Sequence, residues 1–498
     1  MMNESLKLLL PILSLSAVAF ILLGLDAASR ESTASVRRAG FWLTLLGFAM
    51  AAFFLAPQNG NAPIPFGRQM LVWDGLSYFL SWVALLTVFF VALLSVQDKE
   101  FAGMRLSAYF ALLLLSAAGL ILIACANDFL VIFLAIELIG VPGFILTGYL
   151  RHQERSNEGA IKFFLIGAFS SAMLAYGISL LYGITGTTSL VHLHEALPSV
   201  QDKGPLLILA MIFIIISFGF KIALVPFHMW VPDAFEGAPV PVAAFLSVAP
   251  KIAGVAVALR VFTLALTVPA LGMLQILAVL AAITMTVANM IGLQQTHVVR
   301  LLAYSSIAHM GYILLGLVAN TPMGASSVYL YGWIYLFMNL GAFAIVVCIS
   351  NAMGSHELSA YAGLGKRAPF LSGLLALFLL SLAGIPPTAG FVAKFYVFAA
   401  AYDAGWLWLV ILATLNSVIS VGYYFKILHA MYFQPPSASA PVEISLSIRL
   451  ALGLTSAVTL LLGVYPQYAL MRTQTLAMVQ APASNMPNSS DAAPPVQP

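Results

Sequence analysis

Long apolar stretches, separated by short polar segments, follow one another along the chain from its beginning to about residue 470. A transmembrane helix needs about 20 consecutive, mainly apolar residues, and fourteen stretches reach that length. The pattern predicts an all-α polytopic membrane protein with about 14 transmembrane helices. The predicted spans are 6–26, 39–57, 72–96, 106–126, 128–149, 159–184, 205–229, 240–263, 271–291, 298–318, 326–349, 368–401, 406–432 and 447–468.

Composition supports the membrane class and excludes several others. Of the 498 residues, 61% are hydrophobic and 8% are charged, whereas a soluble domain has about 25% charged residues. The net charge of +3 gives no indication of nucleic-acid binding. Cys125 and Cys348 both lie inside apolar runs, so we interpret them as packing residues and expect no disulfide or metal framework. No transit segment is visible, which favours a bacterial cell inner membrane.

Lysine and arginine residues predict the orientation, because cytoplasmic loops carry the excess of positive charge. Loops after odd-numbered spans hold eleven of the 21 basic residues and the opposite face holds five. The odd loops are therefore predicted to be cytoplasmic, with both termini on the outer, periplasmic face. The eleven are Arg30, Arg37, Arg38, Lys99, Arg105, Arg151, Arg155, Arg300, Lys366, Arg367 and Arg449, and the five are Lys7, Arg68, Lys203, Arg260 and Arg472.

Two lysines lie in similar surroundings and indicate an internal repeat. Lys221 and Lys394 are 173 residues apart, and each shares an apolar run with glycine and proline. At the same spacing, Glu137 corresponds to a position beside His309, and Lys251 to one near Lys426. Spans 4–8 and 9–13 are thus predicted to be two five-helix units, the second inverted because each has an odd number of helices, with helices 7 and 12 broken. The predicted domains are residues 1–105 (three N-terminal helices), 106–263 and 271–432 (the two repeats), 433–470 (a C-terminal helix) and 471–498 (a disordered tail).

The charged residues inside the predicted spans are candidates for function. They are the one acid far from a span end and the five lysines that were assigned to neither face, namely Glu137, Lys162, Lys221, Lys251, Lys394 and Lys426. A charge at the bilayer centre costs about 2.5–3.5 kcal/mol on insertion scales. A structural ion pair is the simpler alternative for Glu137 and one lysine, but one acid cannot pair with five lysines. Since burial disfavours a charged lysine and a nearby carboxylate favours it, such lysines can load and release protons.

Two of these lysines and three histidines have a plain alternative to a role in proton transfer. Lys162 is close to the start of its span and can extend to the cytoplasm, and Lys426 and His429 lie near a span end. His309 is a candidate proton relay because histidine titrates near neutral pH, although a histidine on an apolar helix is often only hydrogen-bonded. His228 borders the loop between spans 7 and 8, where it either links the path to water or caps a helix.

Prolines beside two of the lysines predict interrupted helices. Pro226 cannot donate a hydrogen bond to the carbonyl of Ile222, and the pair Pro386 and Pro387 leaves the carbonyls of Leu382 and Ala383 free. Inside a membrane such carbonyls need a polar partner or water. We therefore expect local hydration beside Lys221 and Lys394, although a packing kink is the alternative.

Several motifs resemble the antiporter-like membrane subunits of respiratory complex I, the proton-pumping NADH-quinone oxidoreductase (NDH-1). They are residues 133–138 (FLAIEL), 221–233 (KIALVPFHMWVPD), 236–239 (EGAP) and 302–311 (LAYSSIAHMG). Within that family the chain looks most like subunit N. It shows no long lateral helix after span 14, whereas subunit L has one. In addition, Lys394 stands where subunit M typically has glutamate.

The resemblance implies that quinone reduction elsewhere in the complex drives protons through this chain. Glu137 and Lys221 would be the coupling pair, Lys251 the central relay and Lys394 the residue near the outward exit, and Lys162 also matches a family lysine. Pro250, before Lys251, departs from the small residue expected there and puts the local helix geometry in doubt.

The resemblance also sets the expected cofactors and partners. The chain has no nucleotide loop, cysteine cluster or haem motif, so we expect it to bind no cofactor, while the complex uses NAD and quinone. The expected partners are other membrane subunits of the complex, such as subunit M and small subunits, and membrane lipid, with no nucleic acid. An Mrp-type sodium–proton antiporter, a membrane hydrogenase or a ferredoxin–quinone complex remain alternatives.

Overall fold

The computed structural model describes residues 4–478, except 30–33, 59, 61–62, 68, 199, 201–203, 267–271 and 437–441. Three basic residues that were used to predict the orientation, Arg30, Arg68 and Lys203, lie outside the described residues. So do residues 479–498 of the predicted tail.

The apolar stretches fold as long helices. The N-terminal part comprises α1 (Glu4–Ala28), α2 (Ala34–Leu55), strands β1 (Ile64–Phe66) and β2 (Leu71–Trp73), α3 (Gly75–Ser95) and the short 3-10 helix η1 (Lys99–Phe101). Next come α4 (Leu106–Cys125), α5 (Phe129–Thr147), α6 (Glu154–Thr185), α7 (Leu190–Ala196), α8 (Gly204–Ile222), α9 (Trp230–Gly237) and α10 (Val240–Arg260), which continues into the π-helical turn η3 (Val261–Ala265). The remaining elements are α11 (Met273–Gly292), α12 (Val298–Ala319), α13 (Pro322–Met353), the 3-10 turn η5 (Leu358–Tyr361), α14 (Leu364–Arg367), α15 (Pro369–Ala383), α16 (Ala389–Asp403), α17 (Leu407–Phe433), α18 (Leu446–Val464) and α19 (Gln467–Met478).

Within the described residues, 13 helices are long and apolar enough to cross a membrane. The predicted span 368–401 forms two shorter helices, α15 and α16, separated by residues 384–388. The prediction of an all-helical polytopic membrane protein is thereby confirmed, with one small addition: β1 and β2 form an antiparallel hairpin before α3.

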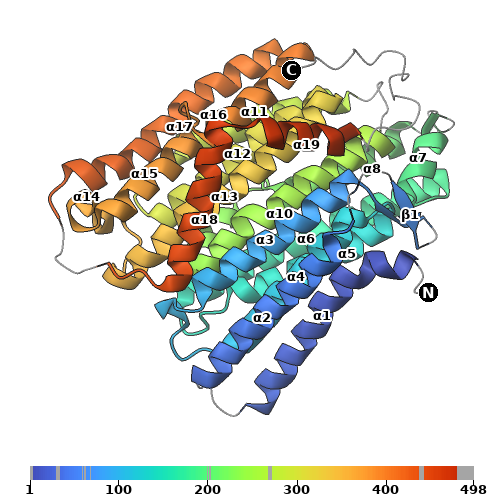
Figure 1. The fold of residues 1–498 in the computed structure, drawn as a ribbon. Helices are drawn as coiled ribbons and strands as arrows, with labels where there is room; N and C mark the ends of the chain where they lie inside the picture. Colours follow the sequence, from blue (N-terminus) through green and yellow to red (C-terminus); the bar gives the residue numbers. More distant parts are fainter. Residues whose placement is uncertain are drawn as a thin grey trace, which may run out of the picture.

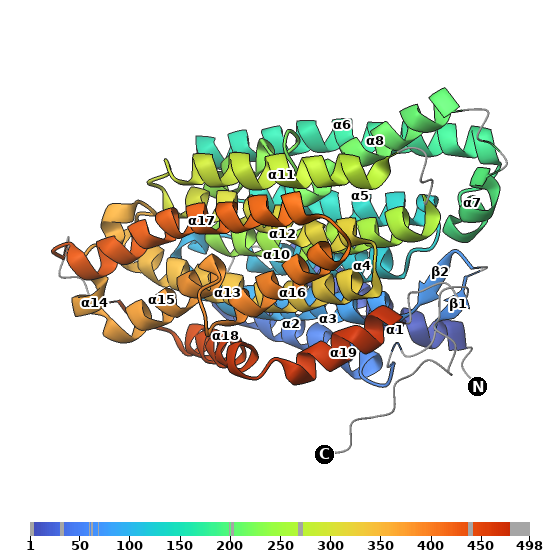
Figure 2. The ribbon, with the colours of Figure 1, turned by 90° about the horizontal axis from the view of Figure 1, so that it is seen from above.

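Most of the long helices lie roughly parallel in one bundle, whereas α18 and α19 run at different angles, as Figures 1 and 2 show. Every residue of α12 is buried except Arg300, and α12 packs against α10, α11, α13 and α16. Helices α10 and α13 are also buried along nearly their whole length. The centre of the protein is therefore formed by the helices that carry Lys251 and His309.

Corresponding helices of the two predicted repeats have similar lengths. Helices α6 and α13 both have 32 residues, and α4 and α11 both have 20 residues. The inverted relation between the two units stays a prediction.

The expected disordered tail from residue 471 is wrong for its first part, because residues 471–478 belong to helix α19. Thr473, Leu476 and Ala477 are buried there, and α19 packs against α3 and α13. The carbonyl of Leu476 lies so close to Gly75 that a side chain at Gly75 would collide with it. These three buried residues form the face of α19 that packs against the bundle.

Arg260, which was counted toward the outer face, is a buried residue that joins three helices. Its side chain is 1% exposed, and its Nη2 atom lies 2.6 and 2.7 Å from the two carboxylate oxygens of Asp74, at the start of α3. Its Nη1 atom donates to the carbonyls of Ala124 and Ala126, each at 2.8 Å, at the end of α4. This arginine therefore stabilises the structure and contributes no charge to a loop.

Candidate functional site

Glu137 and Lys221 lie close together without a direct ion pair. Lys221 is the penultimate residue of α8, and its Nζ atom lies against Gly140, one turn after Glu137 on α5. Glu137 accepts a hydrogen bond from the hydroxyl of Ser171 on α6 and is within electrostatic reach of Lys221. Glu137 and Lys221 are not among the ion pairs within 4.0 Å that the described residues form. The charges of Glu137 and Lys221 therefore interact electrostatically although the two side chains are not in direct contact.

The chain leaves the helix directly after Lys221. Ala223 has a positive φ of 65°, a left-handed conformation that is uncommon for a residue with a side chain. The N–H of Leu224 donates to the carbonyl of Gly219, and the N–H of Val225 donates to the hydroxyl of Thr284 on α11 at 3.0 Å. Trp230 donates from its indole nitrogen to the carbonyl of Phe220 at 3.3 Å. Side chains of α9 and α11 thus bind backbone groups on either side of this break.

Lys251 lies in the middle of the protein and has a neutral partner. Its side chain is 0% exposed, and its Nζ atom donates to the hydroxyl of Ser306 on α12 at 2.6 Å. The ammonium group also lies 5.1 Å from the centre of the Phe235 ring. Pro250 does not interrupt the helix, since α10 continues from Val240 to Arg260, so Lys251 is presented from a continuous helix.

His309 joins three helices through hydroxyl groups. Its Nδ1 atom lies 2.7 Å from the hydroxyl of Tyr331 on α13, and its Nε2 atom lies 3.3 Å from the hydroxyl of Tyr424 on α17. Tyr424 also forms a hydrogen bond with Ser305, one turn before His309. His309 is within electrostatic reach of both Lys251 and Lys394. The histidine is therefore close enough to both lysines to be influenced by their charges, and it belongs to a buried set of groups that can each donate and accept a proton.

Lys394 has partners at the second helix break. Its side chain is 4% exposed, and its Nζ atom donates to the carbonyl of Ala383 and to the hydroxyl of Ser417, each at 2.8 Å. The Ala383 carbonyl is one of the two that the prolines were expected to leave free, and Ser417 donates to it as well. Lys394 also borders a cavity of about 420 Å³ between α16 and α17. The break thus supplies a polar partner for the lysine.

The spacing of 173 residues had implied that the two lysines occupy equivalent places in their units. The structure shows that they do not. Lys221 precedes its break, at the end of α8, whereas Lys394 follows its break, in the second turn of α16. The residue spacing is misleading because corresponding helices are offset by less than 173 residues: α8 begins at residue 204 and α15 at residue 369, which is an offset of 165.

Lys162 is half-exposed and paired with carboxylates. Its side chain is 44% exposed and lies 2.6 Å from Glu158 and 2.7 Å from Asp233 of α9. Arg300, at the start of α12, binds Asp233 at 2.8 Å and Glu236 at 2.6 Å. Lys162 therefore belongs to a surface ion-pair network and is separate from the buried groups.

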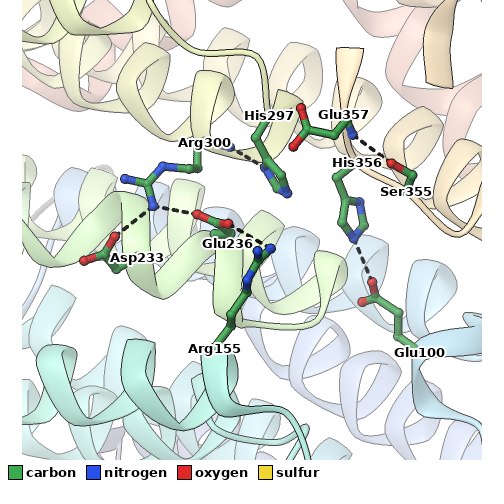
Figure 3. A network of polar contacts seen from close by, with 9 residues as sticks. All are labelled: Glu100, Arg155, Asp233, Glu236, His297, Arg300, Ser355, His356 and Glu357. Atoms are coloured by element: carbon green, nitrogen blue, oxygen red, sulfur yellow. Dashed lines mark hydrogen bonds and ion pairs between the residues drawn. The ribbon is translucent and has the colours of Figure 1, made fainter. Parts of the chain in front are cut away.

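This network continues through histidines (Figure 3). Arg155 binds Glu236 at 3.3 Å, and His356 lies 3.1 Å from Glu100. The rings of His297 and His356 are 5.4 Å apart. These residues come from the segments that follow spans 3, 5, 7, 9 and 11. These odd-numbered loops therefore lie on one face of the bundle, as the sequence predicted, and we call it the odd-loop face.

Comparison with known proteins identifies the family. Residues 126–420 match the family described as "NADH:quinone oxidoreductase/Mrp antiporter, TM". A protein of Solibacter usitatus named NADH-quinone oxidoreductase subunit N 2 is 41% identical over 424 residues, which cover 85% of this chain and 86% of that protein. The NADH-quinone oxidoreductase subunit N of Heliobacterium modesticaldum is 37% identical over 466 residues, which cover 93% and 97%. The chain belongs to the subunit N family of NADH-quinone oxidoreductases.

Solved structures show the same fold, and one of them belongs to respiratory complex I. A chain of respiratory complex I from Thermus thermophilus with bound aureothin has a TM-score of 0.79 and 31% identity, covering 93% of this chain and 98% of that chain. A chain of the Mrp complex from Dietzia sp. has a TM-score of 0.83 at 21% identity, covering 96% and 97%. The second similarity shows the shared fold alone.

Some polar residues of this subunit N family member could not be singled out from its sequence. Ser306 and Ser417 bind the buried lysines, and Tyr331 and Tyr424 bind His309. Serine and tyrosine are common in membrane helices, so only their contacts distinguish these four. Within the described residues, His, Cys, Asp and Glu form no group of three or more that could hold a metal ion.

Proposed function

We propose that this chain translocates protons as the subunit N of a membrane-bound NADH-quinone oxidoreductase. The observation that carries the proposal is the pair of buried lysines, Lys251 and Lys394, which bind hydroxyl or carbonyl oxygens in place of carboxylates. A buried charge without a counter-ion is costly, and a lysine in such a place can lose its proton when a neighbouring charge changes. Quinone reduction elsewhere in the complex supplies the energy.

The proposed path begins at Glu137 and Lys221 and ends at Lys394. His228 lies in the break after α8, within electrostatic reach of Lys251. Lys251 and Lys394 are both within reach of His309. A change of charge at Glu137 and Lys221 can therefore pass stepwise along the bundle without any long-range movement of a side chain.

Lys162 takes part in a different way from the buried groups. Its ion pairs with Glu158 and Asp233 keep the lysine charged at the face formed by the odd-numbered loops, so its proposed role is to influence, through its charge, how these two carboxylates collect protons. This role follows from its place at the surface and from the titratable groups around it.

The setting of the chain follows from the same proposal. The odd-loop face is cytoplasmic and both termini are periplasmic in a bacterial inner membrane. Other membrane subunits of the complex cover the outer helices, and NADH and quinone bind to other chains. An Mrp-type antiporter or a hydrogenase subunit is not favoured, because the relatives at 37–41% identity are named subunit N.

Single substitutions at the first pair test the proposal. Glu137→Ala and Lys221→Ala should each lower proton uptake by membrane vesicles with NADH by at least about ten-fold, or about 1.4 kcal/mol, while the complex still assembles. Each change removes one of two charges that influence each other. Lys366→Ala, at the odd-loop face and outside the path, is the matched control. Wild-type proton uptake in both variants would reduce the pair to a packing feature and contradict the proposal.

A further inference from the structure

A basic cavity lies between the first turns of α2 and the segment that follows α3. Its volume is about 390 Å³, and Arg37, Arg38, Lys99 and Asp98 border it. Arg37 and Arg38 form none of the ion pairs found among the described residues. Asp26, near the end of α1, is bound to Arg105 at 3.3 Å. The positive charges of Arg37 and Arg38 at the cavity are therefore not neutralised by an ion pair with a carboxylate of the described residues.

Asp98 does not offset this charge at neutral pH. Its side chain is 2% exposed, and its Oδ2 atom has no hydrogen-bond partner. Burial, with a smaller effect of the Glu100 charge, raises the pKa of Asp98 to about 8. A carboxyl group with this pKa is mainly protonated at pH 7.

After Arg38, towards its C-terminal end, α2 exposes apolar side chains on one side. Trp42, Leu46, Met50 and Phe53 follow Arg38 at intervals of three or four residues and are 65%, 51%, 38% and 73% exposed. This spacing places them on one side of the helix. From Arg38 to Phe53 the helix rises about 22 Å, more than the half-thickness of about 15 Å of a bilayer core. A cationic end above an apolar stripe of this length matches the shape of a phospholipid.

We propose that this cavity binds the phosphate of an anionic phospholipid, whose acyl chains lie along the exposed side of α2. Arg37 and Arg38 contact the phosphate, since arginine binds phosphate oxygens with two parallel N–H groups. Basic pockets between membrane helices on the cytoplasmic side are known sites for anionic headgroups. A free phosphate ion has the same chemistry at the cavity, but it would make no use of the apolar stripe.

Photoactivatable lipids can test this in the assembled complex. The complex is placed in phosphatidylcholine vesicles that contain a small share of either phosphatidylglycerol or phosphatidylcholine with a photoactivatable acyl chain. Labelling of the peptide that contains α2 is then measured by mass spectrometry. Phosphatidylglycerol should label wild-type α2 about ten-fold more than phosphatidylcholine does, and R37Q/R38Q should bring the ratio close to one. The control R151Q/K366Q removes two cations from the same face outside the cavity and should keep the wild-type ratio.

Each other result overturns the proposal. Equal labelling by the two lipids in the wild type would show ordinary lipid contact without a headgroup site. No labelling by either lipid would show that another subunit covers α2. If inorganic phosphate abolishes the preference at a concentration that leaves total labelling unchanged, the cavity binds the free ion.

Discussion

The buried lysines differ from the surface lysine in the kind of atom they bind. Lys162 contacts two carboxylates, whereas Lys251 and Lys394 contact hydroxyl and carbonyl oxygens. A carboxylate stabilises the ammonium form by charge, and a serine hydroxyl can bind either form because it both donates and accepts. The protonation state of Lys251 and Lys394 is therefore left to the charges around them, which is what a proton carrier requires.

Lys394 provides a prediction that separates charge from proton transfer. Lys394→Ala should lower NADH-driven pumping by about ten-fold or more, because no titratable group remains beside Ser417. Lys394→Glu should keep part of the activity, since glutamate can also carry a proton. Both are measured as proton uptake per quinone reduced in membrane vesicles, with Lys366→Ala as the control. Full pumping by the alanine variant would show that the path does not pass through Lys394.

Tyr424 provides a second prediction at the same scale. Tyr424→Phe removes the hydroxyl that binds Ser305 and His309 and keeps the ring that packs against Tyr423 at 4.5 Å. Pumping should fall by a factor of about 10 to 100 and should change its pH profile, while the complex assembles normally. Tyr432→Phe, an exposed position on the same helix, should have no effect. An unchanged rate and pH profile in Tyr424→Phe would leave Tyr424 with a packing role only.

At the scale of helices, the sequence predicted the free carbonyls but could not predict their partners. The prolines at 386 and 387 identified Ala383 as one carbonyl without a helical donor, and Lys394 and Ser417 fill that place. Nothing in the sequence alone indicated that Ser417, on the following helix, would face the break. The partner is determined by how α16 and α17 pack, which depends on contacts that are distant in the chain.

Other elements were missed because their signal is weak or misleading. Helix α19 buries small side chains such as Thr473 and Ala477, which give no strong apolar pattern. Arg260 was assigned to a loop because arginine at a span end usually faces water, yet its partner Asp74 lies 186 residues away. The predicted spans were reliable because length and apolar character are local properties of the chain.

The ion pair of Arg260 and Asp74 gives a prediction at this scale. Arg260→Ala should lower the free energy of unfolding by about 3–5 kcal/mol, because it leaves a buried carboxylate unpaired. Arg105→Ala is a matched control, since Arg105 forms an exposed pair with Asp26, which contributes about 0–1 kcal/mol. Assembly yield and the midpoint of chemical unfolding measure both effects. Equal losses in the two variants would contradict the importance of burial.

At the scale of the whole molecule, one side of the bundle carries both charge and exposed apolar groups. Leu134, Val141 and Ile145 are 62%, 49% and 50% exposed and lie on the same side of α5 as Glu137. Glu137 and Lys221 are themselves partly exposed in the single chain. Charged groups that face lipid cost about 2.5–3.5 kcal/mol each at the bilayer centre. This side of α5 therefore needs a covering partner that is at least partly polar.

The final prediction concerns the chain without its partners. Expressed alone and purified in mild detergent, it should aggregate or be degraded, because the charges of Glu137 and Lys221 then have no covering subunit. The double variant E137L/K221M should be more stable than the wild type as a single chain, measured by its unfolding midpoint and its lifetime in membranes. Inside the complex the same variant should abolish pumping, so stability and activity would change in opposite directions. The control L134A/I145A alters the same side of α5 without changing its charge. Because it leaves the charges of Glu137 and Lys221 in place, it should not stabilise the single chain. A monodisperse wild-type chain that moves protons by itself would show that the exposed charges need no partner.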